Sequence, residues 1–399
     1  MSKSKENIFI EPWIETEGWD KVDFSKVETP SYVVLLEKLE NNLKILKGVE
    51  EKTGARILMA LKGFSMFSTF PLIKKYLSGS EASSVNEARL GCKEFGKETH
   101  VFSPSYTDEN IEEYIKYADH LVFNSFSQVA IARKALTNQG GKISLGLRVN
   151  LEHSEVETSM YDPSSENSHF GVTKINFEKE NMVGLEGLHF HNLCELGADA
   201  LERSLKVFEE KFGEFLPQMK WVNFGGGHHI TRKDYDLELL YKILNDFKKK
   251  YSHLEVYLEP GEAVALNAGV LVASVVDIFK NGMNIAVIDV SATCHMPDVL
   301  EMPYLPSILG AEQAIEGNSN NYRLVGPSCL TGDVIGEYSF NKPLEIGQKL
   351  VFMNMAIYTM VKNNTFNGVN LPNITTVDKT GKIKIIKKFG YKDFKNRLS

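Results

Sequence analysis

The stretch "RILMALKGFSMFS", from Arg56 to Ser68, places a lysine at the end of an apolar run. Most lysines keep the ammonium group in water while the stem lies on apolar atoms, so a solvated Lys62 is the simple interpretation. A lysine desolvated at a strand end instead loses its proton more readily and forms a Schiff base with a carbonyl group. The rest of the chain decides between a surface lysine and a reactive one.

Seven further short runs follow the first, separated by helix-like segments. The eight runs are RILMAL from 56, GSEASS from 79, THVFS from 99, HLVFN from 120, ISLGLRVN from 143, LEGLHFH from 185, KWVNF from 220 and LEVYLE from 254. The segments between them keep helical spacing, as in Leu39, Leu43, Leu46 and Val49. Eight alternations of strand and helix predict an α/β fold, a (β/α)₈ TIM-like barrel, which we place at residues 29–265.

Two segments depart from this rhythm. LEHSEVETSMYDPSSENSHFGVTK, which begins at Leu151, follows the fifth run, and loops of this length in a compact domain usually carry function. After Ala265 the pattern changes to β-rich stretches without regular helices, namely VLVASVVDIF, NIAVIDVSA, YRLVG, KLVFMNMAIYTM and KIKIIKKFG. We expect a second domain, a β-sandwich or open barrel, formed by residues 266–399 together with 1–28.

The composition is that of a folded chain. Its 399 residues, 43% hydrophobic and 24% charged, suffice for a barrel of about 250 residues plus a second module. A net charge of −7 argues against nucleic acid as a partner and agrees with a cationic small-molecule substrate. The four cysteines form no CxxC pair, so they predict neither a disulfide framework nor a zinc site. No stretch reaches the ~18 apolar residues of a membrane span, and the first residues lack a secretory pattern, so we expect a cytoplasmic protein.

The chemistry of such a barrel gathers at the C-terminal ends of its strands. Lys62 ends the first run, His191 the sixth and Glu259 the eighth, and the triplet Gly225, Gly226 and Gly227 ends the seventh. Backbone N–H groups of a glycine triplet approach a phosphate without obstruction by a Cβ atom. A carboxylate beside a lysine and a phosphate loop suits a pyridinium nitrogen. The combination indicates a pyridoxal phosphate site.

The motif GLHFHN leaves an alternative open. His189 and His191 alternate onto one strand face, a spacing that also suits a pair of metal ligands. A metal-dependent barrel hydrolase would explain the histidines but leaves Lys62 and the glycines without a role. A histidine packed in a crowded barrel mouth is the simplest interpretation, and we expect no metal site.

Six motifs, in this order, resemble the carboxynorspermidine/carboxyspermidine decarboxylase family: ALKGFS, HFHNLCE, NFGGGHH, LEPGEA, SATCHMPDVLEMPY and GPSCLTGD. The family has the alanine-racemase-like fold (fold type III) of diaminopimelate, ornithine and arginine decarboxylases. The resemblance runs from Thr29 to about Gly368. It implies a pyridoxal phosphate enzyme of polyamine biosynthesis that forms norspermidine or spermidine. Diaminopimelate decarboxylase is the runner-up, and a catalytically silent homologue acting as a binding protein is the non-enzymatic alternative.

The resemblance also implies roles for single residues. Lys62 holds the cofactor covalently, His191 stacks on its ring, and Glu259 pairs with the ring nitrogen. Gly225, Gly226, Gly227 and Tyr358 resemble the phosphate ligands. Glu81 matches an acidic residue near the cofactor. Cys329 matches the cysteine that returns a proton to the product carbon, offered by the neighbouring subunit of a head-to-tail homodimer.

Departures from the relatives bear on the substrate. Glu262 stands where ornithine-type enzymes have a phosphate-binding arginine after the EPG motif. Leu330 follows the cysteine where those enzymes have an acid, and Asp333 comes later. We expect the acidic residues near the signature motifs to bind a cationic substrate tail; they are Glu262, Asp298, Glu301 and Asp333. In the long loop, the family's Ser-Arg-Leu-Gly is replaced by Ser-His-Phe-Gly at residues 168–171.

Overall fold

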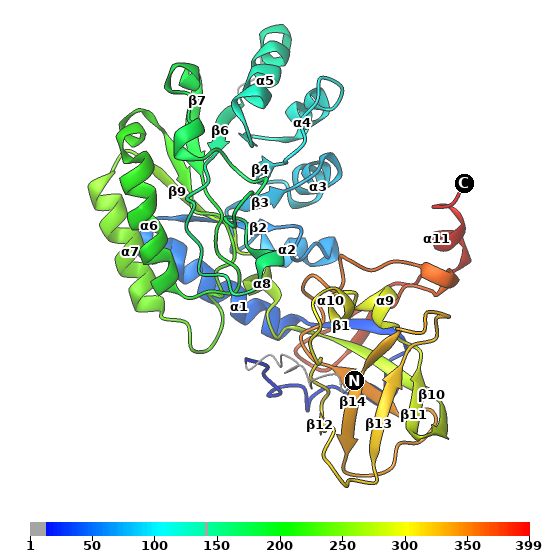
Figure 1. Ribbon diagram of the computed structural model, residues 1–399. Coiled ribbons are helices and arrows are strands. Elements are labelled where there is room, and N and C mark those ends of the chain that lie inside the picture. Colours follow the sequence, from blue (N-terminus) through cyan, green and yellow to red (C-terminus); the bar gives the residue numbers. More distant parts are fainter. Residues whose placement is uncertain (1–12, 140–142) are drawn as a thin grey trace. The chain divides into compact units, whose positions relative to one another are not determined.

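A computed structural model describes residues 13–139 and 143–399 of the chain. The backbone divides into two compact units. One is Glu40–Val264, apart from residues 140–142, and the other is Ala265–Ser399 with the described residues up to Leu39. The first unit contains a closed parallel barrel and the second a mixed sheet (Figure 1). The predicted fold class is therefore confirmed.

All eight predicted runs form barrel strands. They are β2 (Arg56–Ala60), β3 (Gly79–Ala82), β4 (Glu98–Phe102), β5 (His120–Phe123), β6 (Ser144–Arg148), β7 (Leu185–His189), β8 (Trp221–Asn223) and β9 (Glu255–Leu258). Each pairs in parallel with the next, and β2 pairs with β9 to close the ring. Even the polar run of β3 is buried, because Gly79 lets the backbones approach; a Cβ there would lie 2.2 Å from the Glu98 carbonyl oxygen.

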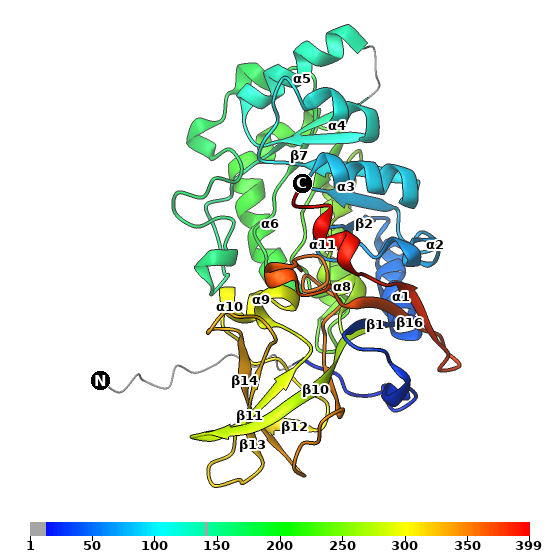
Figure 2. The ribbon, with the colours of Figure 1, turned by 90° about the vertical axis from the view of Figure 1, so that its right-hand side faces the viewer.

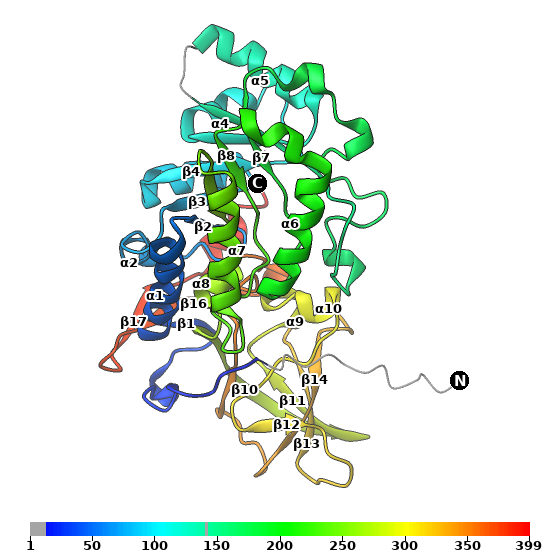
Figure 3. The same ribbon diagram turned by 90° about the vertical axis from the view of Figure 1, so that its left-hand side faces the viewer.

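Helices alternate with the strands around the barrel, and α1 precedes the first of these strands. Their bounds are α1 Leu36–Thr53, α2 Phe70–Ile73, α3 Val85–Leu90, α4 Ile111–Tyr117, α5 Phe126–Gln139, α6 Ala198–Phe212, α7 Leu237–Lys250 and α8 Glu262–Ala265. Helices α6 and α7 lie side by side along one flank (Figures 1 and 3). The apolar stripe of α6 is buried as its spacing predicts, and it includes Leu201, Leu205, Phe208 and Phe212.

An apolar layer fills the barrel interior at mid-height. Its members come from five strands and are Leu58, Phe102, Val122, Trp221 and Tyr257. Trp221 fits because β6 and β7 each present a glycine beneath it. A Cβ on Gly187 would lie 2.1 Å from the indole ring, and one on Gly146 would lie 2.3 Å from it. The Trp221 ring therefore occupies the space that side chains at positions 146 and 187 would otherwise fill.

The sheet of the second unit runs in the order β12-β14-β13-β11-β10-β1-β16-β17, with β15 also paired to β10. Figure 2 labels β10, β11, β13 and β14 of this sheet. The bounds are β1 Ser31–Leu35, β10 Gly269–Asn281, β11 Met283–Ile288, β12 Ala311–Gln313, β13 Asn321–Val325, β14 Val334–Phe340, β15 Lys349–Phe352, β16 Asn373–Val377 and β17 Ile383–Lys387. Three short helices accompany them, α9 Ala292–His295, α10 Asp298–Glu301 and α11 Tyr391–Lys395. None of the helices in the described residues is long and apolar enough to cross a membrane.

Strand β1 lies elsewhere than the sequence suggests. The sequence starts the barrel at residue 29, whereas the five buried residues of β1 pair with β10 on one side and β16 on the other. Val33 and Leu35 pack there against Trp19 and Val270 in the core of the sheet unit. A short, fully buried strand carries no local signal of the sheet it joins, so its placement depends on these partners.

Candidate active site

Charged and polar side chains gather at the C-terminal ends of the barrel strands. Parallel strands bring these ends to one rim. The rim carries Lys62 after β2, Glu81 in β3, Arg148 at the end of β6, His189 and His191 at and after the end of β7, Gly225 to Gly227 after β8, and Glu259 after β9. The positions that the sequence singles out in this unit are thus brought together.

Lys62 sits in a turn held from both sides. The Leu61 N–H donates to the Glu81 carbonyl oxygen at 2.9 Å, and the Ala60 N–H donates to the Pro260 carbonyl oxygen at 3.3 Å. The next residue, Gly63, touches the turn after β9, and a Cβ on it would lie 2.9 Å from Gly261 Cα. These contacts seat the half-buried Lys62 between the strand of Glu81 and the turn that follows Glu259.

Glu259 is a buried carboxylate held in its ionised form. His189 Nε2 lies 3.2 Å from one carboxylate oxygen, and Asn223 Nδ2 donates to the other at 2.5 Å. Burial by itself would raise the pKa of Glu259, but His189, and more weakly the charges of His100 and Lys62, outweigh it and lower the pKa to about 2. A fixed, ionised carboxylate at this point suits a cationic ring nitrogen.

Glu81 behaves in the opposite way. It is 2% exposed, and one of its carboxylate oxygens, Oε2, has no hydrogen-bond partner in the structure. Burial, followed by the negative charge of Glu259, raises the pKa of Glu81 to about 8, although Lys62 opposes the shift. The pKa values of the two buried carboxylates are therefore shifted in opposite directions, which leaves Glu259 ionised and Glu81 protonated at neutral pH.

The glycine triplet forms a tight cradle beside His191. A Cβ on Gly226 would lie 2.4 Å from the Glu259 carbonyl oxygen, and one on Gly227 would lie 1.9 Å from the Leu193 carbonyl oxygen. Gly227 also has a φ of +80°, which favours glycine. The Gly226 N–H donates to His191 Nδ1 at 2.9 Å. Burial and the charge on Lys62 lower the pKa of His191 well below its usual value, so its ring is neutral.

Arg148 is a site residue that the sequence analysis missed. It is 5% exposed, its Nη2 donates to the His191 carbonyl oxygen at 3.0 Å, and its guanidinium carbon lies 4.4 Å from the Phe102 ring centroid. Phe170 of the long loop covers it at 4.6 Å. The loop is fixed by Asn124, whose side chain accepts from the Gly171 N–H at 2.6 Å. Phe170, in the loop where the sequence departs from the family, thus packs against Arg148.

Glu262 belongs to a second acidic group near the rim. Its Oε2 lies 3.0 Å from His229 Nε2, and Glu195 offers a further carboxylate within 4.8 Å of these ligand atoms. Burial and the charge of Glu262 raise the pKa of Glu195 to about 7. Burial lowers the pKa of His229, but the two carboxylates outweigh it and raise the pKa above its ordinary value. The group presents negative charge that suits a cation.

The remaining predicted site residues lie in the sheet unit. Cys329 is exposed, and its N–H donates to Asn367 Oδ1 at 2.8 Å. Tyr358 is half-buried and has a φ of +45°. Asp298 and Glu301, of α10, both contact the Lys362 ammonium.

Asp333 makes contacts that the sequence does not reveal. It is 3% exposed, and its carboxylate accepts from the hydroxyl groups of Ser291 at 2.8 Å and Ser328 at 2.6 Å. It also accepts from the Thr293 N–H at 3.3 Å. These contacts engage both of its oxygens and tie the loop that carries Cys329 to the start of α9.

Comparison with known proteins identifies the family. Residues 32–356 match the family described as "Pyridoxal-dependent decarboxylase, C-terminal sheet domain". A carboxynorspermidine/carboxyspermidine decarboxylase of Campylobacter jejuni is 44% identical over 384 residues, covering 94% of this chain and 99% of that protein. The chain belongs to the pyridoxal-dependent decarboxylases. The resemblance in the six sequence motifs is confirmed, and the cofactor of this decarboxylase is pyridoxal phosphate.

A further relative and a solved structure are also similar to this chain over nearly its whole length. A carboxyaminopropylagmatine decarboxylase of Synechocystis sp. is 40% identical, covering 94% of this chain and 96% of that protein. The crystal structure of carboxynorspermidine decarboxylase from Campylobacter jejuni, complexed with norspermidine, superposes with a TM-score of 0.85 at 44% identity. The superposition covers 93% of this chain and 100% of that one.

The rim fits the decarboxylase cofactor. The ionised Glu259 suits a protonated pyridine nitrogen. The unpartnered Oε2 of Glu81 is a buried polar atom available to a bound molecule. The two histidines that raised the metal-hydrolase alternative have separate contacts, His189 with Glu259 and His191 with Gly226. Family membership rules that alternative out.

We expect Glu81→Gln to change how stability of the cofactor-free protein depends on pH. Because the folded protein holds the Glu81 proton up to a pKa of about 8, while the unfolded chain releases it near its ordinary value, stability falls as pH rises between these values. Glutamine cannot ionise, so the variant should lose part of this fall and gain stability relative to wild type at pH 8, with little difference at pH 5. Denaturant unfolding at a series of pH values measures the difference. A variant-to-wild-type difference that stays constant with pH contradicts the assignment.

Proposed function

We propose that this enzyme removes the α-carboxylate of carboxynorspermidine or carboxyspermidine to give norspermidine or spermidine. The observation that carries the proposal is the 44% identity, over nearly the whole chain, to a decarboxylase that acts on these substrates, together with the solved relative complexed with norspermidine. The acidic group at the rim agrees with a substrate that carries positive charge along its length.

The proposed roles follow from the contacts at the rim. Pyridoxal phosphate supplies an electron sink for the charge left on the substrate carbon when CO₂ departs. Lys62 provides the amine that binds it covalently, Glu259 holds the proton on its ring nitrogen, and neutral His191 packs against its ring. Gly225, Gly226, Gly227 and Tyr358 bind its phosphate. Protonated Glu81 adds no further negative charge beside Glu259.

The substrate tail is assigned to Glu262. Its carboxylate sits with Glu195 beside His229, and a cationic tail would neutralise the excess charge of the two acids. Asp298 and Glu301 form a second acidic pair, on α10, neutralised by Lys362 in the structure. Asp333 is assigned a different role, because its carboxylate is engaged by Ser291 and Ser328 and positions the Cys329 loop.

We further propose a homodimer in which each sheet unit offers Cys329 to its partner's barrel. An exposed thiol, held by its backbone contact with Asn367, suits delivery of a proton to a neighbouring subunit. A cysteine thiol is largely protonated at neutral pH and is therefore an acid. The four cysteines are all free, which agrees with the reducing cytoplasm as the setting.

A second candidate substrate is carboxyaminopropylagmatine. The 40% identical relative from Synechocystis sp. is named for it, and its tail ends in a guanidinium group in place of an ammonium group. Carboxylates bind both cations, so the acidic group at the rim does not separate them. Diaminopimelate decarboxylase, by contrast, is only a distant relative.

Incubation of the purified enzyme with each carboxylated substrate, followed by product identification, tests the function. We expect CO₂ release and norspermidine from carboxynorspermidine, with a kcat/KM far above that for diaminopimelate. Faster turnover of carboxyaminopropylagmatine would support the second candidate. A protein that binds pyridoxal phosphate yet turns over none of these substrates would contradict the proposal and support the silent homologue.

Glu262→Gln should raise KM for the polyamine substrate. The loss of one charge-assisted contact of about 1.5–3 kcal/mol corresponds to roughly a ten- to hundred-fold change, with kcat little affected if the contact is equal in ground and transition states. Glu238→Gln, which alters an exposed acid paired with Lys52 at 3.7 Å, is the matched control and should keep wild-type kinetics. An unchanged KM in Glu262→Gln removes this residue from the tail site.

Mixed dimers test the role of Cys329. Refolding equal amounts of Lys62→Ala and Cys329→Ala chains together should yield half heterodimers, each with one intact composite site of two. Activity should therefore recover to about a quarter of wild type. Activity no higher than the mean of the two separate variants would show that Lys62 and Cys329 act within one chain, or that Cys329 takes no part.

A further inference from the structure

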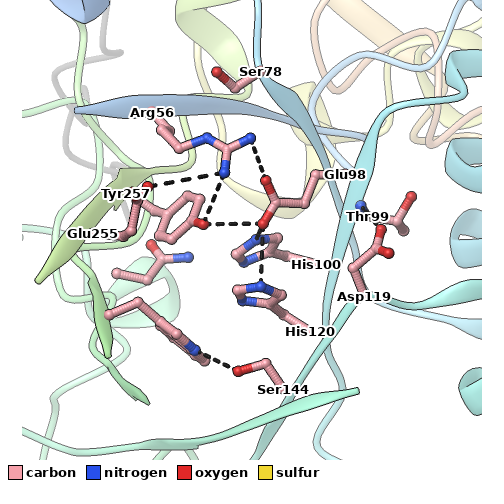
Figure 4. Close-up of polar contacts among 12 residues, drawn as sticks. Arg56, Ser78, Glu98, Thr99, His100, Asp119, His120, Ser144, Glu255 and Tyr257 are labelled. Carbon is pink, nitrogen blue, oxygen red and sulfur yellow. Dashed lines mark hydrogen bonds and ion pairs between the residues drawn. The ribbon is translucent and has the colours of Figure 1, made fainter. Parts of the chain in front are cut away.

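A polar cluster occupies the opposite, N-terminal end of the barrel interior (Figure 4). Glu98 opens β4, His100 follows two residues later on the same strand, and His120 opens β5. His100 and His120 are direct partners in the register of these two parallel strands. Residues two apart on a strand face the same side, so all three side chains share the interior.

The cluster is separate from the active site along the barrel axis. Phe102 and Val122 lie two residues further along β4 and β5 and belong to the apolar layer that also contains Trp221. The rim residues lie beyond that layer, where Phe102 contacts Arg148. The cluster is therefore a group for which the decarboxylation proposal provides no role.

Three potential ligand atoms converge in this cluster. His100 Nε2 and His120 Nε2 lie 3.0 and 3.1 Å from Glu98 Oε1, and all three atoms lie within 4.8 Å of one another. A tetrahedral zinc ion with bonds of about 2.0–2.1 Å places its ligand atoms about 3.3 Å apart. The two nitrogen–oxygen separations are thus only a few tenths of an ångström shorter than zinc requires.

Each histidine of the cluster has one ring nitrogen without a partner. Nδ1 of His100 and Nδ1 of His120 lack a hydrogen-bond partner in the described structure. A neutral imidazole carries its proton on one nitrogen and offers a lone pair on the other, so a ring with its proton on Nδ1 presents Nε2 to a metal.

Surrounding groups fix the carboxylate. Arg56 Nη2 contacts the other oxygen, Glu98 Oε2, at 2.5 Å, so Oε1 remains directed at the histidines. The Tyr257 hydroxyl donates to Oε1 at 3.0 Å, and the His100 and His120 rings stack with centroids 3.9 Å apart. Such outer contacts orient ligands and tune affinity. The positive charge of Arg56 opposes a second cation, but Glu255 lies 3.9 Å from it and offsets that charge.

We propose that Glu98, His100 and His120 bind one divalent transition-metal cation of the zinc type at the N-terminal end of the barrel. Two imidazoles and one carboxylate, with a fourth position left for water, form a donor set that zinc accepts. The ion would link β4 to β5 and so stabilise the barrel from the end opposite the active site. Our expectation of no metal site came from the cysteine pattern and from His189 and His191, and this cluster involves none of these residues.

The test uses the full chain with its cofactor bound, freed of metal by a chelator and then titrated with Zn²⁺. Wild type should bind one equivalent at this site, with a rise in Tm that saturates with the ion. His120→Asn and Glu98→Gln should weaken this binding by at least about tenfold. His253→Gln, which alters an exposed histidine before β9, is the matched control and should bind as wild type does.

A second arm separates this cluster from the group of Glu195, His229 and Glu262, which also has ligand geometry. Glu195→Gln disables that group, so the variant should keep the Zn²⁺ equivalent. Loaded with Co²⁺, it should show the strong visible bands of tetrahedral coordination at wavelengths beyond the cofactor's absorption. This measurement stands even if His120→Asn fails to fold. Absence of the bands, no Zn²⁺ binding by wild type, or unchanged binding in both ligand variants would overturn the proposal.

Discussion

The structure of the rim depends on two buried carboxylates that share one small volume in opposite protonation states. Glu259 is kept ionised by His189, while Glu81 is kept protonated by burial and by the charge on Glu259. Two ionised carboxylates at such depth would repel each other without water to screen them. Lys62 adds one positive charge beside them.

The backbone holds this arrangement in place. Asn223 donates to Glu259 and accepts from the Gly225 N–H at 2.9 Å, so one amide links the carboxylate to the glycine cradle. The N–H of Gly226 reaches His191, and Gly63 lets the lysine turn touch the turn after β9. Each glycine in this set is required because another backbone or ring occupies the place of its Cβ. These contacts are therefore in place before a ligand binds, as electrostatic preorganisation requires.

Much of this could be read from the sequence. The eight runs predicted the barrel, and the rule that chemistry sits at strand ends brought Lys62, His191 and Glu259 together. Arg148 and Asn223 were missed, although both stand at strand ends, because an arginine or asparagine there fits many roles. The hydrogen bonds that Asp333 accepts from two serine hydroxyl groups depend on tertiary partners. The same holds for the pairing of β1 within the sheet. No local pattern specifies such partners.

Borohydride reduction of the holoenzyme, followed by peptide mapping, identifies the amine that holds the cofactor, because reduction fixes the cofactor to it. We expect the label on the peptide containing Lys62, and we expect Lys62→Ala protein to take up no covalent label. A label on any other lysine would contradict this expectation, since the two carboxylates and the glycine cradle would then surround the wrong amine.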